Sequence, residues 1–222
     1  AIPGNDAIKL DNDRLVVAAM SAGSASTGNL FGDAASSGVA LITGTVFDDQ
    51  NENGALDVGE PGLAGVWITL EVNGGSTILV ATGASGSYQV AVAPGSEVRL
   101  TSAGPGGGLN PTTPESVYLQ PAAAGSYPDN DFGYTDDTDR AVIYGLVFDD
   151  LNGNGEQDFG ELGLAGAILT LDGADPITTG ANGTFAYPVS GTAIHVLHET
   201  NPAGYRSTTP DNVNIIVTDR KS

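Results

Sequence analysis

Short stretches of alternating apolar and polar residues run through most of this chain, with turn-forming residues between them. From Val66 to Val72 the apolar residues occupy every second position, so an extended strand here has one apolar and one polar face. Turns rich in Gly, Pro or Asn recur about every eight to twelve residues. This spacing is typical of an all-β sandwich.

The same pattern predicts two series of strands, and Leu15–Val17 is predicted as a further short strand near the start. In the first series we expect strands at 41–47, 66–72, 77–81, 87–92, 96–101, 116–119 and 130–134. In the second series we expect them at 142–148, 167–171, near Phe185 and at 212–217.

A twelve-residue polar segment follows the first strand of each series. Its repetition explains why the strands fall into two series. Residues 49–60 are repeated at 150–161, and both copies lead into a Gly-Leu-Ala-Gly exit. An internal repeat with shared flanks indicates two copies of one structural unit. We therefore predict an N-terminal extension at 1–40, a first sandwich at 41–136 and a second sandwich at 141–222.

The repeated segment fits the twelve-residue calcium loop, because it carries oxygen donors at positions 1, 3, 5, 9 and 12, glycine at position 6 and a backbone carbonyl at position 7. Calcium prefers six to eight such oxygens. An Asx-rich turn that binds nothing is the alternative, and direct ligation by Asp48 and Asp149 is left open. We predict at least two Ca²⁺ ions, one per repeat, with these ligands: Asp49, Asn51, Asn53, Ala55, Asp57 and Glu60 in the first loop, and Asp150, Asn152, Asn154, Glu156, Asp158 and Glu161 in the second.

The ends of the two series differ. The second has no counterpart of Asn130–Tyr134, whereas residues 15–34 resemble residues 117–134. One hypothesis is that the N-terminal segment of one chain completes the second sandwich of the next by strand addition, which would produce a head-to-tail homopolymer. The alternative is that the sequence is a piece of a longer array of neighbouring repeats.

Composition narrows the function classes. Twenty-seven acidic residues against seven basic ones give a formal net charge of −20, which argues against nucleic acid as a partner. No apolar run is long enough for membrane insertion. Cysteine is absent, so disulfides and thiolate metal sites are excluded. Together with calcium loops, this composition favours an extracellular location on a bacterial cell surface.

The repeats resemble the SdrD B-like domains of serine-aspartate surface proteins, within the wider prealbumin-like group that includes the collagen-adhesin B domains. The resemblance rests on a Gly-x-Val-Phe-x-Asp strand before the loop, a Thr-Gly-x-x-Gly-x-Tyr hairpin and an Asp-Phe-Gly-Tyr ending. It implies two tandem prealbumin-like, Ig-like Greek-key β-sandwiches that calcium stiffens into a rod. An internal isopeptide bond, common in collagen-adhesin B domains, is not expected, because Lys9 and Lys221 lie outside both units.

Other candidate chemistry is sparse. His195 and His198 are three residues apart on an expected strand, so they point to opposite faces and do not form a zinc pair. No nucleophile elbow or phosphate loop is present, so we do not expect an enzyme. We expect a calcium-stabilised structural protein, such as a stalk or fibre subunit. The alternatives are an adhesive module that recognises a host protein or glycan and, as a weaker one, a helical scaffold-docking module like a dockerin.

Overall fold

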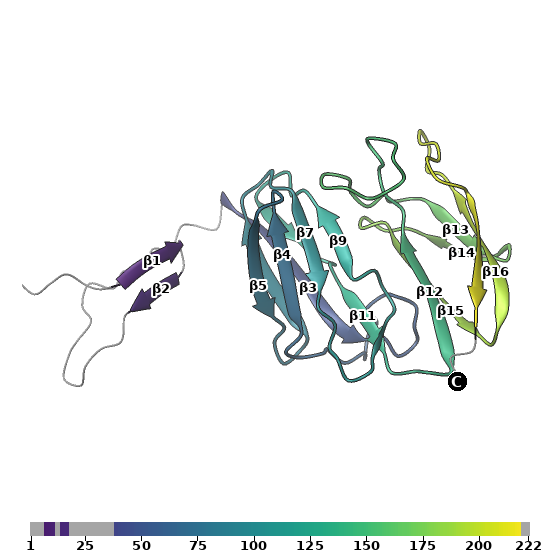
Figure 1. The fold of residues 1–222 in the computed structure, drawn as a ribbon, viewed down its shortest axis with the longest axis horizontal. Coiled ribbons are helices and arrows are strands. Elements are labelled where there is room, and N and C mark those ends of the chain that lie inside the picture. The colour runs from purple at the N-terminus through teal and green to yellow at the C-terminus, as the bar shows by residue number, and fades with distance from the viewer. Residues whose placement is uncertain (1–6, 12–13, 18–37, 219–222) are drawn as a thin grey trace, which may run out of the picture. The chain divides into compact units, whose positions relative to one another are not determined.

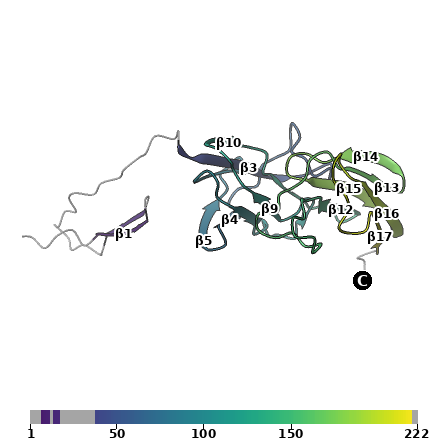
Figure 2. The same cartoon turned by 90° about the horizontal axis from the view of Figure 1, so that it is seen from above.

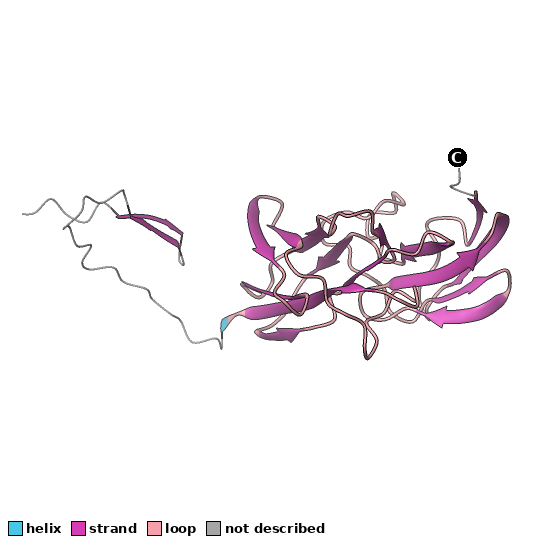
Figure 3. Ribbon diagram, turned by 90° about the horizontal axis from the view of Figure 1, so that it is seen from below, coloured by secondary structure: helices cyan, strands magenta, loops and turns pink. Residues whose placement is uncertain are grey.

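The computed structural model describes residues 7–11, 14–17 and 38–218, and nearly all of its regular structure is β-strand (Figure 3). The chain forms two compact units, residues 1–38 and residues 39–222. The all-β prediction is confirmed, and no helix in the described residues is long and apolar enough to cross a membrane. The helices that a dockerin needs are not present in this part of the chain.

In the N-terminal unit, β1 (Ala7–Asp11) and β2 (Arg14–Val17) form an antiparallel hairpin. The strand predicted at Leu15–Val17 is thus confirmed, while β1 was not predicted. The predicted resemblance of residues 15–34 to a repeat tail falls mostly outside the described residues.

The first sandwich comprises β3 to β11 and has two sheets (Figure 1). One sheet is centred on β3, which pairs antiparallel with β6 on one edge and parallel with β10 and β11 on the other; β11 also pairs with β8. The second sheet has the order β5-β4-β7-β9. The strands are β3 (Ala40–Asp48), β4 (Trp67–Val72), β5 (Ser76–Ala81), β6 (Ser87–Val92), β7 (Val98–Ser102), β8 (Asn110–Pro111), β9 (Ser116–Leu119), β10 (Gly125–Tyr127) and β11 (Phe132–Thr135).

Alternation along these strands builds the core of the first sandwich. In β6 the buried residues are Tyr88, Val90 and Val92, and the residues between them are exposed. Phe132 and Tyr134 of β11 are fully enclosed in the same cluster. Trp67 lies on the outer face of β4 and is 54% exposed, as its position in the alternation predicts.

The second sandwich comprises β12 to β17 and repeats most of this plan (Figure 2). One sheet contains β12 and β15, and the other has the order β14-β13-β16-β17. Aligning the two polar loops matches β3, β4, β5, β6, β7 and β9 with β12, β13, β14, β15, β16 and β17 in turn. The strands are β12 (Arg140–Leu146), β13 (Ile168–Leu171), β14 (Ala174–Thr178), β15 (Thr184–Ser190), β16 (Ala193–Thr200) and β17 (Asn212–Val217).

The second core is thinner than the first. Its buried cluster consists of Ile143, Ala167, Leu169, Tyr187 and Val189, and several other apolar residues are only partly covered. No strand in the described residues takes the places of β10 and β11. Most predicted strands are found within a few residues of their expected bounds, but the division into sandwiches at 41–136 and 141–222 stays a prediction.

Candidate metal centres

Each polar loop leaves the sandwich at the end of its first strand, and backbone contacts close its base. Phe47 pairs with Gly62 across the first loop, and Phe148 pairs with Gly163 across the second. A Cβ on Gly62 would lie 1.8 Å from the carbonyl oxygen of Ser85, so only glycine permits this approach. The Gly-Leu-Ala-Gly exit shared by the copies therefore fixes each loop against the neighbouring hairpin.

In the first loop the amides of two asparagines converge on one carboxylate. Oδ2 of Asp57 accepts hydrogen bonds from Nδ2 of Asn51 at 2.7 Å and from Nδ2 of Asn53 at 2.8 Å. These two bonds, that from Asn51 first, lower the pKa of Asp57. The side chains at positions 3, 5 and 9 of the loop thus already meet at one point.

The first and last carboxylates complete the first loop. Oδ1 and Oδ2 of Asp49 accept the N–H groups of Asn53 at 3.2 Å and Gly54 at 2.8 Å. Oε2 of Glu60 accepts the N–H of Asp57 at 2.9 Å, and its Oε1 accepts the N–H of Gln50 at 3.0 Å. Position 12 therefore folds back onto positions 2 and 9, which closes the loop into a ring.

The second loop has the same arrangement. Oδ2 of Asp158 accepts Nδ2 of both Asn152 and Asn154 at 2.8 Å. Oε2 of Glu161 accepts the N–H of Asp158 at 3.0 Å. Burial raises the pKa of Asp150, but hydrogen bonds from the Thr208 hydroxyl and the N–H groups of residues 153–155 outweigh it, so this pKa is lowered. Two sequences that differ at several positions thus adopt one hydrogen-bond pattern.

No group of three or more His, Asp or Glu side chains in the described residues is arranged to hold a metal ion. In both loops the asparagine oxygens accept backbone N–H groups, and the asparagine amide nitrogens donate to Asp57 and Asp158. The donor set nevertheless fits calcium, because each loop gathers carboxylate and amide oxygens on a ring only twelve residues long. Binding an ion there requires the asparagine amides to rotate away from the aspartate.

The remaining predicted positions behave differently. Ala55 and Glu156 each donate their N–H to the preceding asparagine, so the side chain of Glu156 is not needed in the ring. Asp48 accepts a bond from Nε2 of Gln50 at 3.4 Å. The backbone N–H of Asp149 donates to the carbonyl of Leu162. Ligation by Asp48 or Asp149 stays a prediction.

Sequence reasoning overlooked Glu52, at position 4 of the first loop. Its side chain is fully buried, and its backbone has a φ of +62°, which a non-glycine residue rarely adopts. Its Oε2 lies 3.2 Å from Nε of Arg140, and burial raises its pKa despite that charge. Comparison of the two loops could have indicated the unusual backbone of Glu52, because the second copy has Gly153 at the same position and glycine readily adopts a positive φ.

Both loops also contact the other sandwich. A Cβ on Gly54 would lie 2.7 Å from Cβ of Ala186, so the first loop packs directly on β15. The ring of Phe159 in the second loop meets the ring of Tyr118 on β9 edge to face, with centroids 5.3 Å apart. The loops therefore form part of the junction between the sandwiches.

The two histidines contact different partners. Nδ1 of His195 is 2.8 Å from Oδ2 of Asp172, and Nδ1 of His198 is 3.1 Å from Oδ1 of Asn212. Each imidazole is engaged with a different neighbouring strand or turn. They share no ligand position.

Comparison with known proteins gives a family match for part of the chain. Residues 40–117 match the SdrD B-like domain family. The chain is 28% identical over 216 residues to serine-aspartate repeat-containing protein D of Staphylococcus aureus strain Newman, which covers 84% of the chain and 16% of that protein. It is 27% identical over 186 residues to serine-aspartate repeat-containing protein F of Staphylococcus epidermidis, which covers 76% of the chain and 11% of that protein. The chain thus spans less than a fifth of the length of these relatives.

Among solved structures, the chain is similar to a streptococcal ancillary pilin, with 15% identity, 82% of this chain and 60% of that chain covered, and a TM-score of 0.34. It is also similar to the shaft pilin SpaA of Lactobacillus rhamnosus GG, with 15% identity, coverage of 82% and 94%, and a TM-score of 0.32.

Proposed function

We propose a function from one premise: residues 40–117 are an SdrD B-like domain, and the chain is a distant homologue of the serine-aspartate repeat surface proteins. The protein is a non-enzymatic, calcium-stabilised structural module that works outside the cell, on a bacterial surface, as part of a stalk or fibre. Each polar loop holds one Ca²⁺, with the first ligated by residues 49–60 and the second by residues 150–161.

The observation that carries this proposal is the convergence of three side chains in both loops. Asn51 and Asn53 meet on Asp57, and their counterparts meet on Asp158, at nearly equal distances. An Asx-rich turn needs only the bonds from asparagine to backbone N–H groups. It does not require the ring closure by Glu60 and Glu161, which brings a second pair of carboxylate oxygens to the same loop.

Calcium at these positions stabilises more than the loops. Because both loops contact the other sandwich, an ion that orders them also restrains the junction. An ion that binds only the folded chain contributes about 2.7 kcal/mol at a hundredfold excess over its Kd. That is a large share of the 5–15 kcal/mol stability typical of a domain. A restrained junction is the mechanical property that a stalk requires.

Titration calorimetry and thermal melting test the proposal on the full chain. We expect two calcium sites and a clear fall in melting temperature when a chelator is added. Asp57→Ala and Asp158→Ala should each remove one site, whereas Glu156→Gln should keep both because residue 156 contributes only its backbone carbonyl. A chain that takes up no calcium at millimolar concentration, and that melts alike with and without chelator, contradicts the proposal.

Assembly by strand addition is the second part of the proposed function. The edge of β12 opposite β15 pairs with no strand in residues 38–218, whereas the same edge of β3 is covered by β10 and β11. A second copy of the chain, through residues 15–34, and a neighbouring repeat are candidate sources of a strand for this edge. Deleting residues 1–38 and sizing the particles by light scattering separates them, because only self-addition loses its polymers.

An adhesive role is a second candidate function, favoured by the exposed apolar residues Trp67 and Leu79 on the outer face of the β4-β5 pair. In that case the module recognises a host protein or glycan. Trp67→Ala should then abolish binding of the full chain to host cells while leaving calcium uptake and melting unchanged. Equal cell binding by both proteins removes this candidate.

A further inference from the structure

Four residues, 136–139, connect the two sandwiches. β11 ends at Thr135, and β12 begins at Arg140, which already pairs with Ser190 of β15. Three of the four linker residues are aspartates, and like charges in a linker repel one another and favour extension. Relative motion of tandem domains is the default unless their interface restrains it. The orientation of the sandwiches therefore depends on the contacts that fix this short linker.

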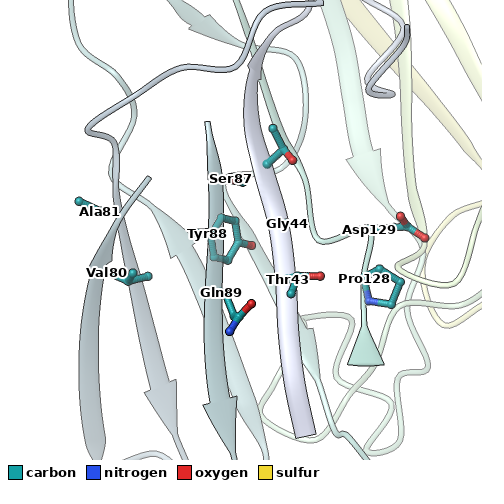
Figure 4. A pocket seen from close by; sticks show the side chains of 10 residues that line it. Thr43, Gly44, Val80, Ala81, Ser87, Tyr88, Gln89, Pro128 and Asp129 are labelled. Atoms are coloured by element: carbon teal, nitrogen blue, oxygen red, sulfur yellow. The ribbon is translucent and has the colours of Figure 1, made fainter. Parts of the chain in front are cut away.

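The segment before the linker is firmly attached to the first sandwich. β11 pairs parallel with β3 and is buried along its whole length. Figure 4 shows the residues that lead into β11, with Asp129 beyond Gly44 of β3 and Tyr88 on the other side of that strand. The hydroxyl of Tyr88 donates to the carbonyl of Asn130 at 2.6 Å. Freedom between the sandwiches is therefore confined to residues 136–139.

Four side chains close a ring around the linker. Oγ1 of Thr135 donates to Oε1 of Glu52 at 3.4 Å and accepts the N–H of Asp137 at 3.1 Å. Oδ2 of Asp137 accepts the Nε–H of Arg140 at 3.2 Å. The same Nε lies 3.2 Å from Oε2 of Glu52, which completes the ring. The first loop, the linker and the second sandwich are thus joined at one point.

Glu52 depends on Arg140 for its counter-charge. The side chain of Glu52 is fully buried, and its Oε2 accepts no hydrogen bond within the described residues. Residues 38–218 contain three arginines and no lysine, and Arg140 is the one that lies within ion-pair distance of Glu52. A buried carboxylate without a counter-charge is strongly unfavourable. The charge of Arg140 therefore holds the second sandwich against the first loop.

The backbone of Glu52 also indicates a role outside the loop. Its φ of +62° lies in the left-handed region, which is unfavourable for a residue with a Cβ. The equivalent residue of the second loop is Gly153, with a φ of +74°, and glycine adopts this conformation freely. Position 4 supplies no ligand in a twelve-residue calcium loop. The contacts with Thr135 and Arg140 are therefore what a glutamate at this position provides.

The ring around the linker is connected to the candidate ligands of the first loop. Glu52 lies between Asn51 and Asn53, whose amides both donate to Asp57. An ion bound by these two asparagines would fix the backbone on both sides of Glu52. A disordered loop would instead let the Glu52 carboxylate move into water, where its charge is better solvated. The state of the first loop thus decides whether Glu52 reaches Arg140.

From these observations we propose that Glu52, Thr135, Asp137 and Arg140 form a latch that sets the orientation of the second sandwich, and that an ordered first loop closes this latch. Glu52 is a positioning residue in this role and not a ligand. The dependence on calcium rests on the proposed function, whereas the latch itself does not. The second loop makes no such contact through position 4, because Gly153 has no side chain.

The distance between spin labels on the two sandwiches tests the latch by pulsed electron paramagnetic resonance. The chain has no cysteine, so labels attach only at the introduced Thr77→Cys and Thr178→Cys, both at exposed positions. In calcium the parent should give one narrow distance distribution. Glu52→Gln and Arg140→Gln should each broaden it, whereas Arg206→Gln, which removes an exposed charge, should not. Unchanged distributions in Glu52→Gln and Arg140→Gln would overturn the proposal.

Thermal melting shows whether the two charged residues act as a pair. Glu52→Gln and Arg140→Gln should each lower the melting temperature by about 2–4 °C, and the double variant by less than the sum, because the second change removes a contact already lost. Additive losses would show that the two residues do not interact and would contradict the latch.

Glu52→Gly separates the latch from the local conformation of the loop. Glycine relieves the positive φ, so a residue that served only the loop would leave the distance distribution narrow and the melting temperature equal or higher. The latch predicts a broad distribution in this variant. A narrow one would overturn the proposal.

Calorimetry tests whether the first loop closes the latch, in the Asp158→Ala background that keeps only the first site. The positive charge of Arg140 alone opposes calcium, so Arg140→Gln would tighten the site if only its field mattered. Closure predicts the reverse: Arg140→Gln should weaken calcium binding by about fivefold or more, because binding and closure stabilise each other. A tighter site, or a parent whose distance distribution stays narrow after chelation, would contradict closure by the loop.

The two readouts keep this inference apart from the proposed function. A broadened distribution in Glu52→Gln, in a chain that takes up no calcium, rejects the calcium function and keeps the latch. Calcium uptake at both loops, with an unchanged distribution in Glu52→Gln and Arg140→Gln, keeps the calcium function and rejects the latch.

Discussion

The two sandwiches share six strands and one loop, yet only the first has a closed core. In the first, β3 is a central strand with partners on both edges, and its Ala40, Ile42 and Val46 are fully buried. In the second, β12 pairs only with β15 among the residues that the structure describes, and the equivalent residues Ala141 and Val147 are only partly covered. The additional pairing of β3 with β10 and β11 contributes to this difference, because the loop and its flanks are nearly the same in both units.

From this difference we expect the two units to differ in stability. Apolar burial contributes roughly 25 cal/mol per Å², and the aromatic residues of β11 have no equivalent in the second cluster. The second sandwich therefore relies more on what contacts it from outside, including the first loop against Ala186. We expect its melting to respond more than that of the first sandwich to calcium and to an added strand.

The largest expected contrast is the loss of stability on replacing the equivalent glycines Gly44 and Gly145. A Cβ on Gly44 would lie 2.0 Å from the carbonyl oxygen of Asn130, whereas a Cβ on Gly145 would meet the ring of Phe185. The backbone at Asn130 is held by the neighbouring strand and cannot move away from an added Cβ, whereas the side chain of Phe185 can move. Gly44→Ala should destabilise the chain by about 3 kcal/mol and Gly145→Ala by about 1 kcal/mol, measured by denaturant unfolding. Equal losses would show that the second edge is as constrained as the first.

Much of this fold could be predicted from the sequence, since alternation and turn residues locate strands directly. In β6 the buried positions follow the period of two, and Trp67 is exposed where the alternation puts it. Short strands such as β8 and β10 were not predicted, because two or three residues carry no period. They exist because β3 and β11 offer edges to pair with, which is tertiary information.

Donor spacing located both polar loops in the sequence, and their ligand sets stay a prediction; the connections of the loops to the rest of the molecule were not predicted. The spacing of oxygen donors predicts that residues 49–60 form a ring of hydrogen bonds, because its members are close in sequence. The ion pair between Glu52 and Arg140 joins residues far apart in the chain, and no periodic pattern encodes it. The contact of Gly54 with Ala186 likewise depends on how the sandwiches meet.

The equivalent valines give a smaller contrast. Val117 is enclosed and Val213 is half exposed on the same inner face. Val117→Ala should cost about 2 kcal/mol, from lost burial and a residual cavity. Val213→Ala should cost less than about 0.5 kcal/mol. Thermal melting of the two variants measures this contrast, and equal losses would show that both valines are equally enclosed.

The smallest expected contrast is in how stability depends on pH at one equivalent position. This position is Ser102 in the first sandwich and Glu199 in the second. Burial and, after it, the charge of Asp211 raise the pKa of Glu199, and His198 opposes them weakly. A carboxyl whose pKa is raised by folding stabilises the fold below its unfolded pKa and loses that contribution as pH rises through its folded pKa.

Glu199→Gln removes this titration. The variant should melt like the parent below about pH 3, where the carboxyl is protonated in the unfolded state as well, and about 2–4 °C higher near pH 7, for a gain on the order of 1 kcal/mol. Ser102 does not titrate, so Ser102→Ala should shift melting equally at both pH values. A Glu199→Gln gain that is the same below about pH 3 and at pH 7 would contradict a raised pKa of Glu199, because the gain would then not depend on the charge of this carboxyl.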